Sequence, residues 1–233
     1  MFRVPKDKNM TELAIYDMDR TITRAGTFTP FLIHAAMRLA PWRLIFAPLV
    51  ILVMLAYVAK MIERKTLKEI NQTLLIGGKL PIGRIRPITE SYADFVMKAN
   101  VHQGALDQIA EDRAAGRRLV MATASARLYV TAIADRLGFD DLIATNSIYG
   151  IDDIVTAKID GENCYGPAKL RMIEAWMDKQ GLSRADCHIR FYSDHASDAP
   201  VLAWSDAPFA VNAHAKLRRI AETKGWTIVD WGL

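Results

Sequence analysis

Short apolar runs and stretches with a helical pattern alternate along most of this 233-residue chain. The helical pattern predicts helices at 103–115, 126–139 and 167–180, and a last one near the end of the chain. The apolar runs predict strands at 13–17, 117–123, 142–145, 188–194 and 209–212, with a final strand after the last helix. This alternation indicates an α/β fold, a Rossmann-like parallel sheet covered by helices on both faces.

Residues 27–98 interrupt this rhythm directly after the first strand. Their pattern is helical until "LPIGRIRP", where Pro81, Gly83 and Pro87 are expected to break it. We therefore predict two parts, an α/β core made of 1–26 and 99–233 and an inserted all-helical cap at 27–98.

The cap contains "LIFAPLVILVMLAYVA", residues 44–59, without one charged side chain. As a helix it would be about 24 Å long, shorter than the roughly 30 Å hydrocarbon layer of a bilayer. Three interpretations stay open: a helix buried in the cap or in a dimer, a helix in the membrane interface, or a full span. In the second, a neighbouring apolar helix at 28–40 joins it and basic side chains reach the headgroups. Those basic residues are Arg43, Lys60, Arg64, Lys65 and Lys68.

Composition narrows the classes of partner. About half of the residues are hydrophobic, enough for one core and a subdomain, and the net charge of +4 suits an anionic partner. The basic residues are scattered without interleaved aromatics, which argues against nucleic acid. Two cysteines, Cys164 and Cys187, are too few for a disulfide framework and predict free thiols. The first ten residues lack the apolar core of a signal peptide, so we expect a cytoplasmic protein.

Acidic and hydroxyl side chains follow several of the predicted strands. Ligands of open α/β sheets lie at the carboxyl ends of the strands, so these fragments should converge on one rim. Singly, each residue also fits a turn, a helix cap or an exposed loop. The candidates are Asp17, Asp19, Thr123, Ser125, Asp194 and Asp198, with Lys169 near the start of a helix.

Four segments resemble the motifs of the haloacid dehalogenase superfamily of phosphatases: "DMDRT", "MATAS", the lysine of "CYGPAKL", and "SDHASD". Their order and spacing are similar to those of the phosphoserine-phosphatase-like branch, subfamily IB, which carries a helical cap between the first and second motifs. The resemblance covers nearly the whole chain, and the cap is the part that it describes least.

The resemblance implies a phosphomonoester hydrolase. Asp17 would be the nucleophile that forms an aspartyl-phosphate, and Asp19 the general acid and base. Mg²⁺ would be bound by Asp17, the backbone carbonyl of Asp19, and Asp194, with Asp198 helping through water or indirect contacts. The phosphoryl group would be bound by Thr123, Ser125 and Lys169. A second acid in the general-acid position favours phosphoryl transfer over dehalogenation.

The substrate class follows from the cap. In phosphoserine phosphatases a glutamate soon after the first motif binds the substrate ammonium group, whereas Gly26 stands near that position here. An apolar cap with basic flanks instead favours a lipid phosphate, for instance phosphatidylglycerophosphate, at the inner face of the cytoplasmic membrane. Two alternatives stay open. One is a phosphatase of soluble metabolites whose cap is buried in a homo-oligomer, and the other a non-catalytic membrane-associated protein.

Overall fold

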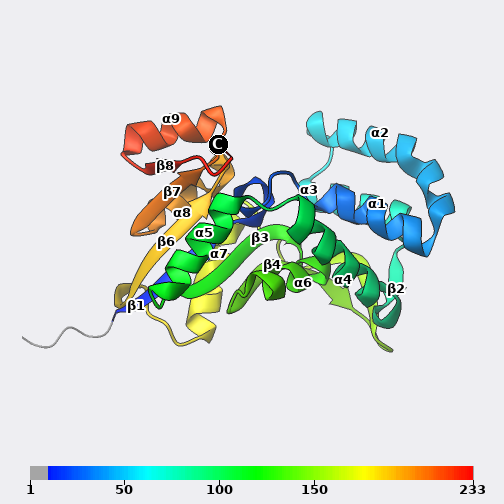
Figure 1. Ribbon diagram of the computed structural model, residues 1–233. Coiled ribbons are helices and arrows are strands. Elements are labelled where there is room, and N and C mark those ends of the chain that lie inside the picture. The colour runs from blue at the N-terminus through cyan, green and yellow to red at the C-terminus, as the bar shows by residue number, and fades with distance from the viewer. Residues whose placement is uncertain (1–9, 233) are drawn as a thin grey trace, which may run out of the picture.

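A computed structural model of the protein describes residues 10–232. One eight-stranded sheet passes through the molecule in the order β2-β5-β4-β3-β1-β6-β7-β8 (Figure 1). All neighbours from β4 to β8 are parallel, while β5 runs antiparallel to β4 and β2. The strands are β1 Thr11–Tyr16, β2 Lys79–Pro81, β3 Arg118–Ala126, β4 Asp141–Tyr149, β5 Ile154–Asp160, β6 Cys187–Ser193, β7 Ala207–Val211 and β8 Thr227–Val229.

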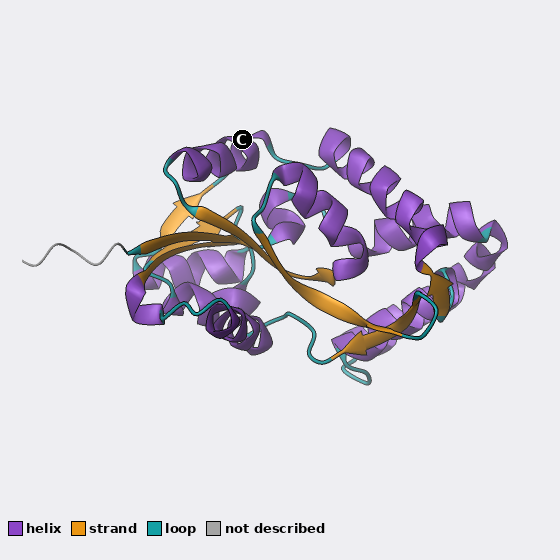
Figure 2. Ribbon diagram, turned by 90° about the horizontal axis from the view of Figure 1, so that it is seen from below, coloured by secondary structure: helices purple, strands orange, loops and turns teal. Residues whose placement is uncertain are grey.

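Helices cover both faces of this sheet (Figure 2). They are α1 Phe28–Leu39, α2 Ala47–Val58, α3 Arg64–Leu75, α4 Ile82–Ala99, α5 Gln103–Ala114, α6 Arg127–Leu137, α7 Pro167–Lys179, α8 Ala199–Trp204 and α9 Ala215–Lys224. Short helical turns lie at Met18–Ile22, Pro41–Phe46, Arg184–Asp186 and Ala196–Asp198. The predicted α/β fold is confirmed, and the expected strands and helices of the core agree with the observed ones to within a few residues.

The central strand β1 separates two hydrophobic clusters. Leu13 and Ile15 pack on the face covered by α7, α8 and α9. Ala14 and Tyr16 point to the other face, where α5, α6 and the cap helices lie. The alternation of a strand's side chains places one pair on each face, and burial on both faces explains why residues 13–16 are all apolar.

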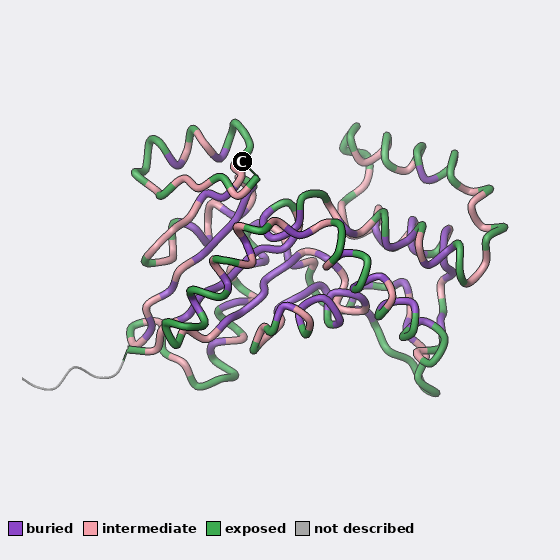
Figure 3. The backbone as a smooth tube through the Cα atoms, viewed as in Figure 1, coloured by how far each residue is buried: buried purple, intermediate pink, exposed green. Residues whose placement is uncertain are grey.

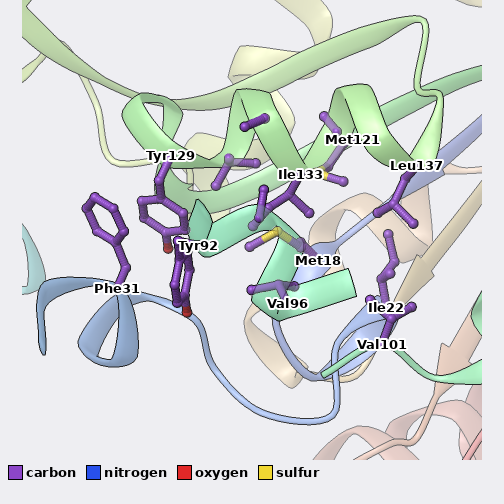
Figure 4. Packing of buried hydrophobic residues seen from close by; sticks show 14 of the residues in the cluster. Met18, Ile22, Phe31, Tyr92, Val96, Val101, Met121, Tyr129, Ile133 and Leu137 are labelled. Carbon is purple, nitrogen blue, oxygen red and sulfur yellow. The ribbon is translucent and has the colours of Figure 1, made fainter. Parts of the chain in front are cut away.

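The inserted segment consists of α1, α2, α3, β2 and α4. An aromatic cluster joins it to the core: the Phe31 ring from α1 stacks on Tyr129 of α6 at 4.4 Å between ring centroids, and Tyr92 of α4 meets both rings (Figure 4). The segment is helical apart from β2, which adds a short strand to β5. The helical pattern is broken as expected at Pro81, where β2 ends, but the expected breaks at Gly83 and Pro87 are wrong, because α4 begins at Ile82 and continues through both.

The apolar cap helix lies on the outside. Figures 1 and 3 show α2 as an outer layer beyond α1, with most of its turns exposed. Pro41–Val58 has a mean hydropathy of 2.0, is long and apolar enough to cross a membrane by length and composition alone, and is 6% buried. The interpretation in which the cap itself buries this helix is therefore wrong. Its exposed apolar residues are Trp42, Ile45, Leu49, Ile51, Leu52, Met54, Leu55 and Val58.

Two other sequence expectations concern the cysteines and the first residues. Cys164 and Cys187 are both free, as predicted, and the structure shows that both are buried. The segment without a signal-peptide core lies outside the described residues, apart from Met10.

Candidate active site

The first acidic pair lies where β1 ends at the centre of the sheet. The Asp17 N–H donates to the Tyr192 carbonyl of neighbouring β6 (2.9 Å), which fixes the backbone at the point where the strand stops. The chain then makes the tight turn Met18–Ile22, in which Arg20 adopts a positive φ of 65°. This turn brings the Thr21 hydroxyl back to Asp17 Oδ2 (3.2 Å).

A buried lysine connects three of the four sequence motifs. Lys169 Nζ lies 2.7 Å from Asp17 Oδ1 and 2.5 Å from Asp198 Oδ2, and its side chain is 2% exposed. Gly166, at a positive φ of 59°, and Pro167 begin α7 and set the direction from which this lysine approaches. Burial lowers the pKa of Lys169, but the Asp17 and Asp198 carboxylates outweigh it and raise the pKa above its ordinary value. The ammonium group therefore stays charged between the two acids.

Asp194 completes the group from the end of β6. The Thr21 hydroxyl oxygen accepts from the Asp194 N–H (3.0 Å) and lies 3.5 Å from Asp194 Oδ1, so Asp17 and Asp194 flank one small side chain. Burial raises the pKa values of Asp17 and Asp194, Lys169 opposes this, and the neighbouring carboxylates add to it. More negative charge is gathered here than Lys169 alone balances.

Asp19 is held separately from the other acids. Its Oδ1 accepts from the Thr27 N–H and hydroxyl, both at 2.7 Å, and its Oδ2 accepts from the Ser125 hydroxyl at 2.5 Å. Thr27 is fully buried and is itself held by Tyr129 (2.8 Å). The Asp19 carboxylate is thus fixed by the end of β3 and by the first residue of the cap.

The second motif lies beside Asp19 at the end of β3. Thr123 is fully buried, and its hydroxyl oxygen accepts from the Ser125 N–H (3.1 Å). The Ser125 side chain, which the resemblance assigns to phosphate binding, donates to Asp19 and thereby orients that carboxylate. The structure thus brings the seven candidate residues together, while their chemical roles remain a prediction.

An open cavity of about 560 Å³ lies over this group. Asp17, Asp19, Lys169, Asp194 and Asp198 line its floor. The turn after the first motif, the cap and the loop before α7 supply its rim, with Arg20, Gly26, Thr27, Phe28, Pro30, Tyr57, Arg64 and Tyr165. The four motif aspartates are the acidic side chains of this lining, as far as the described residues go.

Two basic residues of the cap lie at this site rather than outside it. The Arg64 guanidinium stacks over the Tyr165 ring at 4.2 Å, and both line the cavity. Lys68 is 7% exposed and donates to the Ala124 carbonyl (2.5 Å) and to Asn163 Oδ1 (2.7 Å). The expectation that Lys68 reaches lipid headgroups is therefore wrong, because α3 turns this side chain into the core. No signal in the local sequence distinguishes Lys68 from the more exposed lysines nearby.

The donor set suits a hard divalent cation, although no three His, Cys, Asp or Glu side chains within residues 10–232 form a metal-ligand cluster. Two buried carboxylates with raised pKa values share one hydroxyl neighbour, an arrangement that positive charge would stabilise. Asp198 Oδ1 is buried without a hydrogen-bond partner in the described part of the chain. The residues present thus fit an oxygen-bound cation whose remaining ligands are backbone and water.

Comparisons with known proteins find relatives that match parts of this chain. The inhibition of morphological differentiation protein of Streptomyces azureus is 34% identical over 131 residues, which are 56% of this chain and 46% of that protein. Phosphoserine phosphatase SerB1 of Mycobacterium tuberculosis is 26% identical over 150 residues, 64% of this chain and 48% of that protein. The chain spans about half the length of the curated relatives it matches.

Solved structures share the fold. A protein of unknown function from Bordetella pertussis Tohama I matches with a TM-score of 0.85 and 24% identity, over 95% of this chain and 99% of that one. A substrate-bound phosphoserine phosphatase matches with a TM-score of 0.60 and 18% identity, over 97% and 94% of the two chains. The model of the haloacid dehalogenase-like hydrolases matches residues 14–203, which contain all four motif segments. The chain therefore belongs to the family of haloacid dehalogenase-like hydrolases.

Proposed function

We propose that the protein hydrolyses phosphate monoesters through an aspartyl-phosphate intermediate on Asp17. The observation that carries this proposal is the buried triad in which Lys169 bonds both Asp17 and Asp198. The Asp17 Oδ that attacks phosphorus forms a new O–P bond while the bond from phosphorus to the ester oxygen breaks. Asp19 gives its proton to the leaving oxygen and later takes one from the water that hydrolyses the intermediate.

In this proposal Asp17, Asp194 and the backbone carbonyl of Asp19 would hold Mg²⁺, with Asp198 supporting them indirectly. The bound cation would offset the negative charge of the nucleophile and of the phosphate dianion. The chain's own residues supply the rest of the electrostatics. Lys169 keeps a fixed positive charge beside Asp17, and the Thr21 hydroxyl spaces the two acids apart.

The substrate that the cavity suits best is a phosphorylated lipid. The cap side of the rim is apolar through Phe28, Pro30 and Tyr57, and the cations Arg20 and Arg64 stand at the same rim. Apolar and cationic groups together suit a phosphorylated headgroup attached to acyl chains, as in phosphatidylglycerophosphate. No glutamate lines the cavity within the described residues to bind a substrate ammonium group, which disfavours phosphoserine.

The exposed helix α2 supports a site at a membrane surface. Tyr57 near its end lines the cavity, so an apolar layer that covers α2 also lies at the cavity mouth. We propose that α2 lies in the interfacial region of the cytoplasmic membrane and presents lipid phosphates to Asp17. The free energy gained is that of removing its exposed apolar side chains from water, about 25 cal/mol per Å².

The activity is tested by release of phosphate from p-nitrophenyl phosphate. We expect wild-type activity that EDTA abolishes and Mg²⁺ restores, and a loss of at least roughly a thousandfold in kcat for Asp17→Asn. Circular dichroism of both proteins serves as the control for folding. Equal rates for wild type and Asp17→Asn would overturn the proposal and favour a non-catalytic protein.

The substrate and membrane proposals need a second experiment. We expect wild type to float with anionic vesicles and to hydrolyse phosphatidylglycerophosphate in them faster than soluble phosphate esters. The variant Ile51→Glu/Leu55→Glu should lose flotation and lipid hydrolysis but keep its rate on p-nitrophenyl phosphate. Ile151→Glu, an exposed apolar residue of the β4–β5 turn, is the matched control. A dimer in solution that stays off vesicles would instead favour the homo-oligomer with soluble substrates.

A further inference from the structure

Lys68 differs from the other basic residues of the cap by its burial and its partners. It projects from α3 and donates to two oxygens of the core, the Ala124 carbonyl at 2.5 Å and Asn163 Oδ1 at 2.7 Å. Its Nζ also lies 5.7 Å from the centroid of the Phe28 ring. No carboxylate pairs with it in the described part of the chain, so its placement is not that of an ordinary structural ion pair.

The Ala124 carbonyl belongs to a peptide group inside the second motif. The peptide bond to Ser125 is trans and planar, so fixing the carbonyl on one side fixes the direction of the Ser125 N–H on the other. That N–H donates to Thr123 Oγ1 at 3.1 Å. The same residue's hydroxyl donates to Asp19 Oδ2 at 2.5 Å. This peptide plane therefore bears on the contacts that Ser125 makes with both Thr123 and Asp19.

A small network keeps Lys68 in this position. The Thr145 hydroxyl, from β4, lies 2.7 Å from the Ala124 carbonyl and 3.0 Å from Asn163 Oδ1. The Cys164 N–H donates to the Thr145 hydroxyl oxygen at 3.1 Å, which ties the network to the loop that leads into α7. Lys68 is the member that comes from the cap, and it bonds both acceptors at once.

We propose that Lys68 is a positioning residue for the general acid: from the cap, it fixes the Ala124 peptide and, through Ser125, the carboxyl group of Asp19. This inference rests on the proposed phosphatase activity. It places cap and core in one catalytic unit, because α3 orients a group that acts on the leaving oxygen. Without Lys68, Asp19 remains present but is less well aligned for proton transfer.

The alignment of Asp19 can be tested by comparing the rates for two esters whose leaving oxygens differ in basicity. p-Nitrophenolate departs readily without a proton, whereas the more basic oxygen of phenyl phosphate needs the general acid. In Lys68→Met we expect kcat/KM to fall roughly tenfold more for phenyl phosphate than for p-nitrophenyl phosphate, part of the hundredfold or more that a general acid contributes. Uniform loss on both esters, as from a smaller folded fraction, would leave this ratio unchanged.

Lys65→Met is the matched control. Lys65 lies on the same helix and also donates to a carbonyl of the core, that of Gly161 (3.1 Å), but at the surface and away from the second motif. We expect its ratio of the two rates to equal that of wild type. Asn163→Ala, which removes one acceptor of Lys68, should shift the ratio in the same direction by a smaller factor and keeps the test open if Lys68→Met does not fold.

The outcomes separate the inference from the proposed function. If wild type releases phosphate from neither ester, the phosphatase proposal fails. If wild type is active and the ratio is unchanged in folded Lys68→Met, or in Asn163→Ala where Lys68→Met does not fold, Lys68 is a structural residue and the inference is overturned. A shift in the ratio in both variants, with none in Lys65→Met, supports it.

Discussion

At the scale of single residues, buried charge is concentrated at two places, the active site and Asp112. Asp112 of α5 is fully buried and collects donors from three strands or their flanks. Tyr16 and Tyr192 donate to its Oδ2, and Arg117 and Arg190 to its Oδ1 at 3.2 and 2.7 Å. This carboxylate thus joins α5 to β1 and β6 directly below the strand ends that carry the site.

Removing this carboxylate should destabilise the protein strongly. Asp112→Ala leaves two arginines and two tyrosines without their shared acceptor, and we expect a loss of about 3–5 kcal/mol in the free energy of unfolding. Urea denaturation measures it. The control is Asp107→Ala on the same helix, where an exposed carboxylate bonds Gln103 and a change within about 0.5 kcal/mol is expected. Equal midpoints for the two variants would contradict this account of Asp112.

Lys68 gives the protein a specific dependence of stability on pH. Burial, with Arg64 nearby, lowers its pKa from 10.5 to about 7, and Asp19 only partly offsets this. Between these values the unfolded chain binds more protons at Lys68 than the folded one. Burying the charged ammonium group of Lys68 therefore lowers the free energy of unfolding by its full amount below about pH 7. This destabilisation is lost as the pH rises toward 10.5.

The stability gained or lost in Lys68→Met, relative to wild type, should accordingly change with pH. The free energy of unfolding of the variant, relative to that of wild type, should be highest below about pH 7 and lowest near pH 10. The difference between the two pH values should be up to roughly 4 kcal/mol. Urea midpoints at the two pH values measure the difference. Lys65→Met should show no such trend, and a constant difference for Lys68→Met would contradict the lowered pKa.

Single residues of the site were predictable to the extent that they occur in motifs. The strand-end aspartates and Lys169 stand out in the sequence because strand ends of a parallel sheet meet at one rim. Thr27 and Lys68 do not stand out, since each bonds a group more than 50 positions away in the sequence. The role of Ser125 beside Asp19 likewise follows from tertiary packing.

At the scale of elements, patterns of apolar residues located the core helices and parallel strands well. They failed where local signals compete. Pro87 lies in α4, whose packing against α6 and the aromatic cluster continues the helix past the proline. The antiparallel strands β5 and β2 went unpredicted: β2 has only three residues, and β5 carries exposed polar residues between its buried ones.

Alanine substitution of two helical glycines should change the stability of the protein in opposite directions. A Cβ at Gly83 of α4 meets nothing within 4 Å, so Gly83→Ala should stabilise the protein by about 0.4–1 kcal/mol through the unfolded state. A Cβ at Gly104 of α5 would lie 2.8 Å from Trp231 Cδ1 and 3.0 Å from its Cβ and Cγ.

Gly104→Ala should therefore lower the Tm although alanine favours helices, because the indole must move from its place against Tyr16 and Tyr192. Thermal unfolding of the two variants side by side tests both. A rise in Tm for Gly104→Ala would show that Trp231 moves at little cost.

At the scale of the whole molecule, the sequence predicts an α/β fold and the structure confirms it, while the division into a core and an inserted cap stays a prediction. The sequence does not decide what covers the apolar helix of the cap, because a helix covered by protein and one covered by lipid have the same apolar pattern. The structure removes one of these choices by leaving α2 outside the molecule's own core.

The two thiols should report unfolding of the molecule as a whole. Cys164 and Cys187 belong to the cluster on the α7 side of the sheet, and burial raises the pKa of Cys164 to about 12. Both should react with Ellman's reagent only as fast as the protein opens. We expect slow labelling of the native protein and immediate labelling of two thiols in urea. Fast native labelling of either would indicate local opening at that cysteine.

The central place of β1 has a consequence for biosynthesis. Its neighbours on the two sides, β3 and β6, are made about 100 and 170 residues later, so the first strand emerges from the ribosome long before either partner. The apolar α2 emerges in between, ahead of any sheet for the chain to fold upon. During that interval the nascent chain exposes an unpaired strand and an apolar helix together, and both favour aggregation until β3 and β6 have been made.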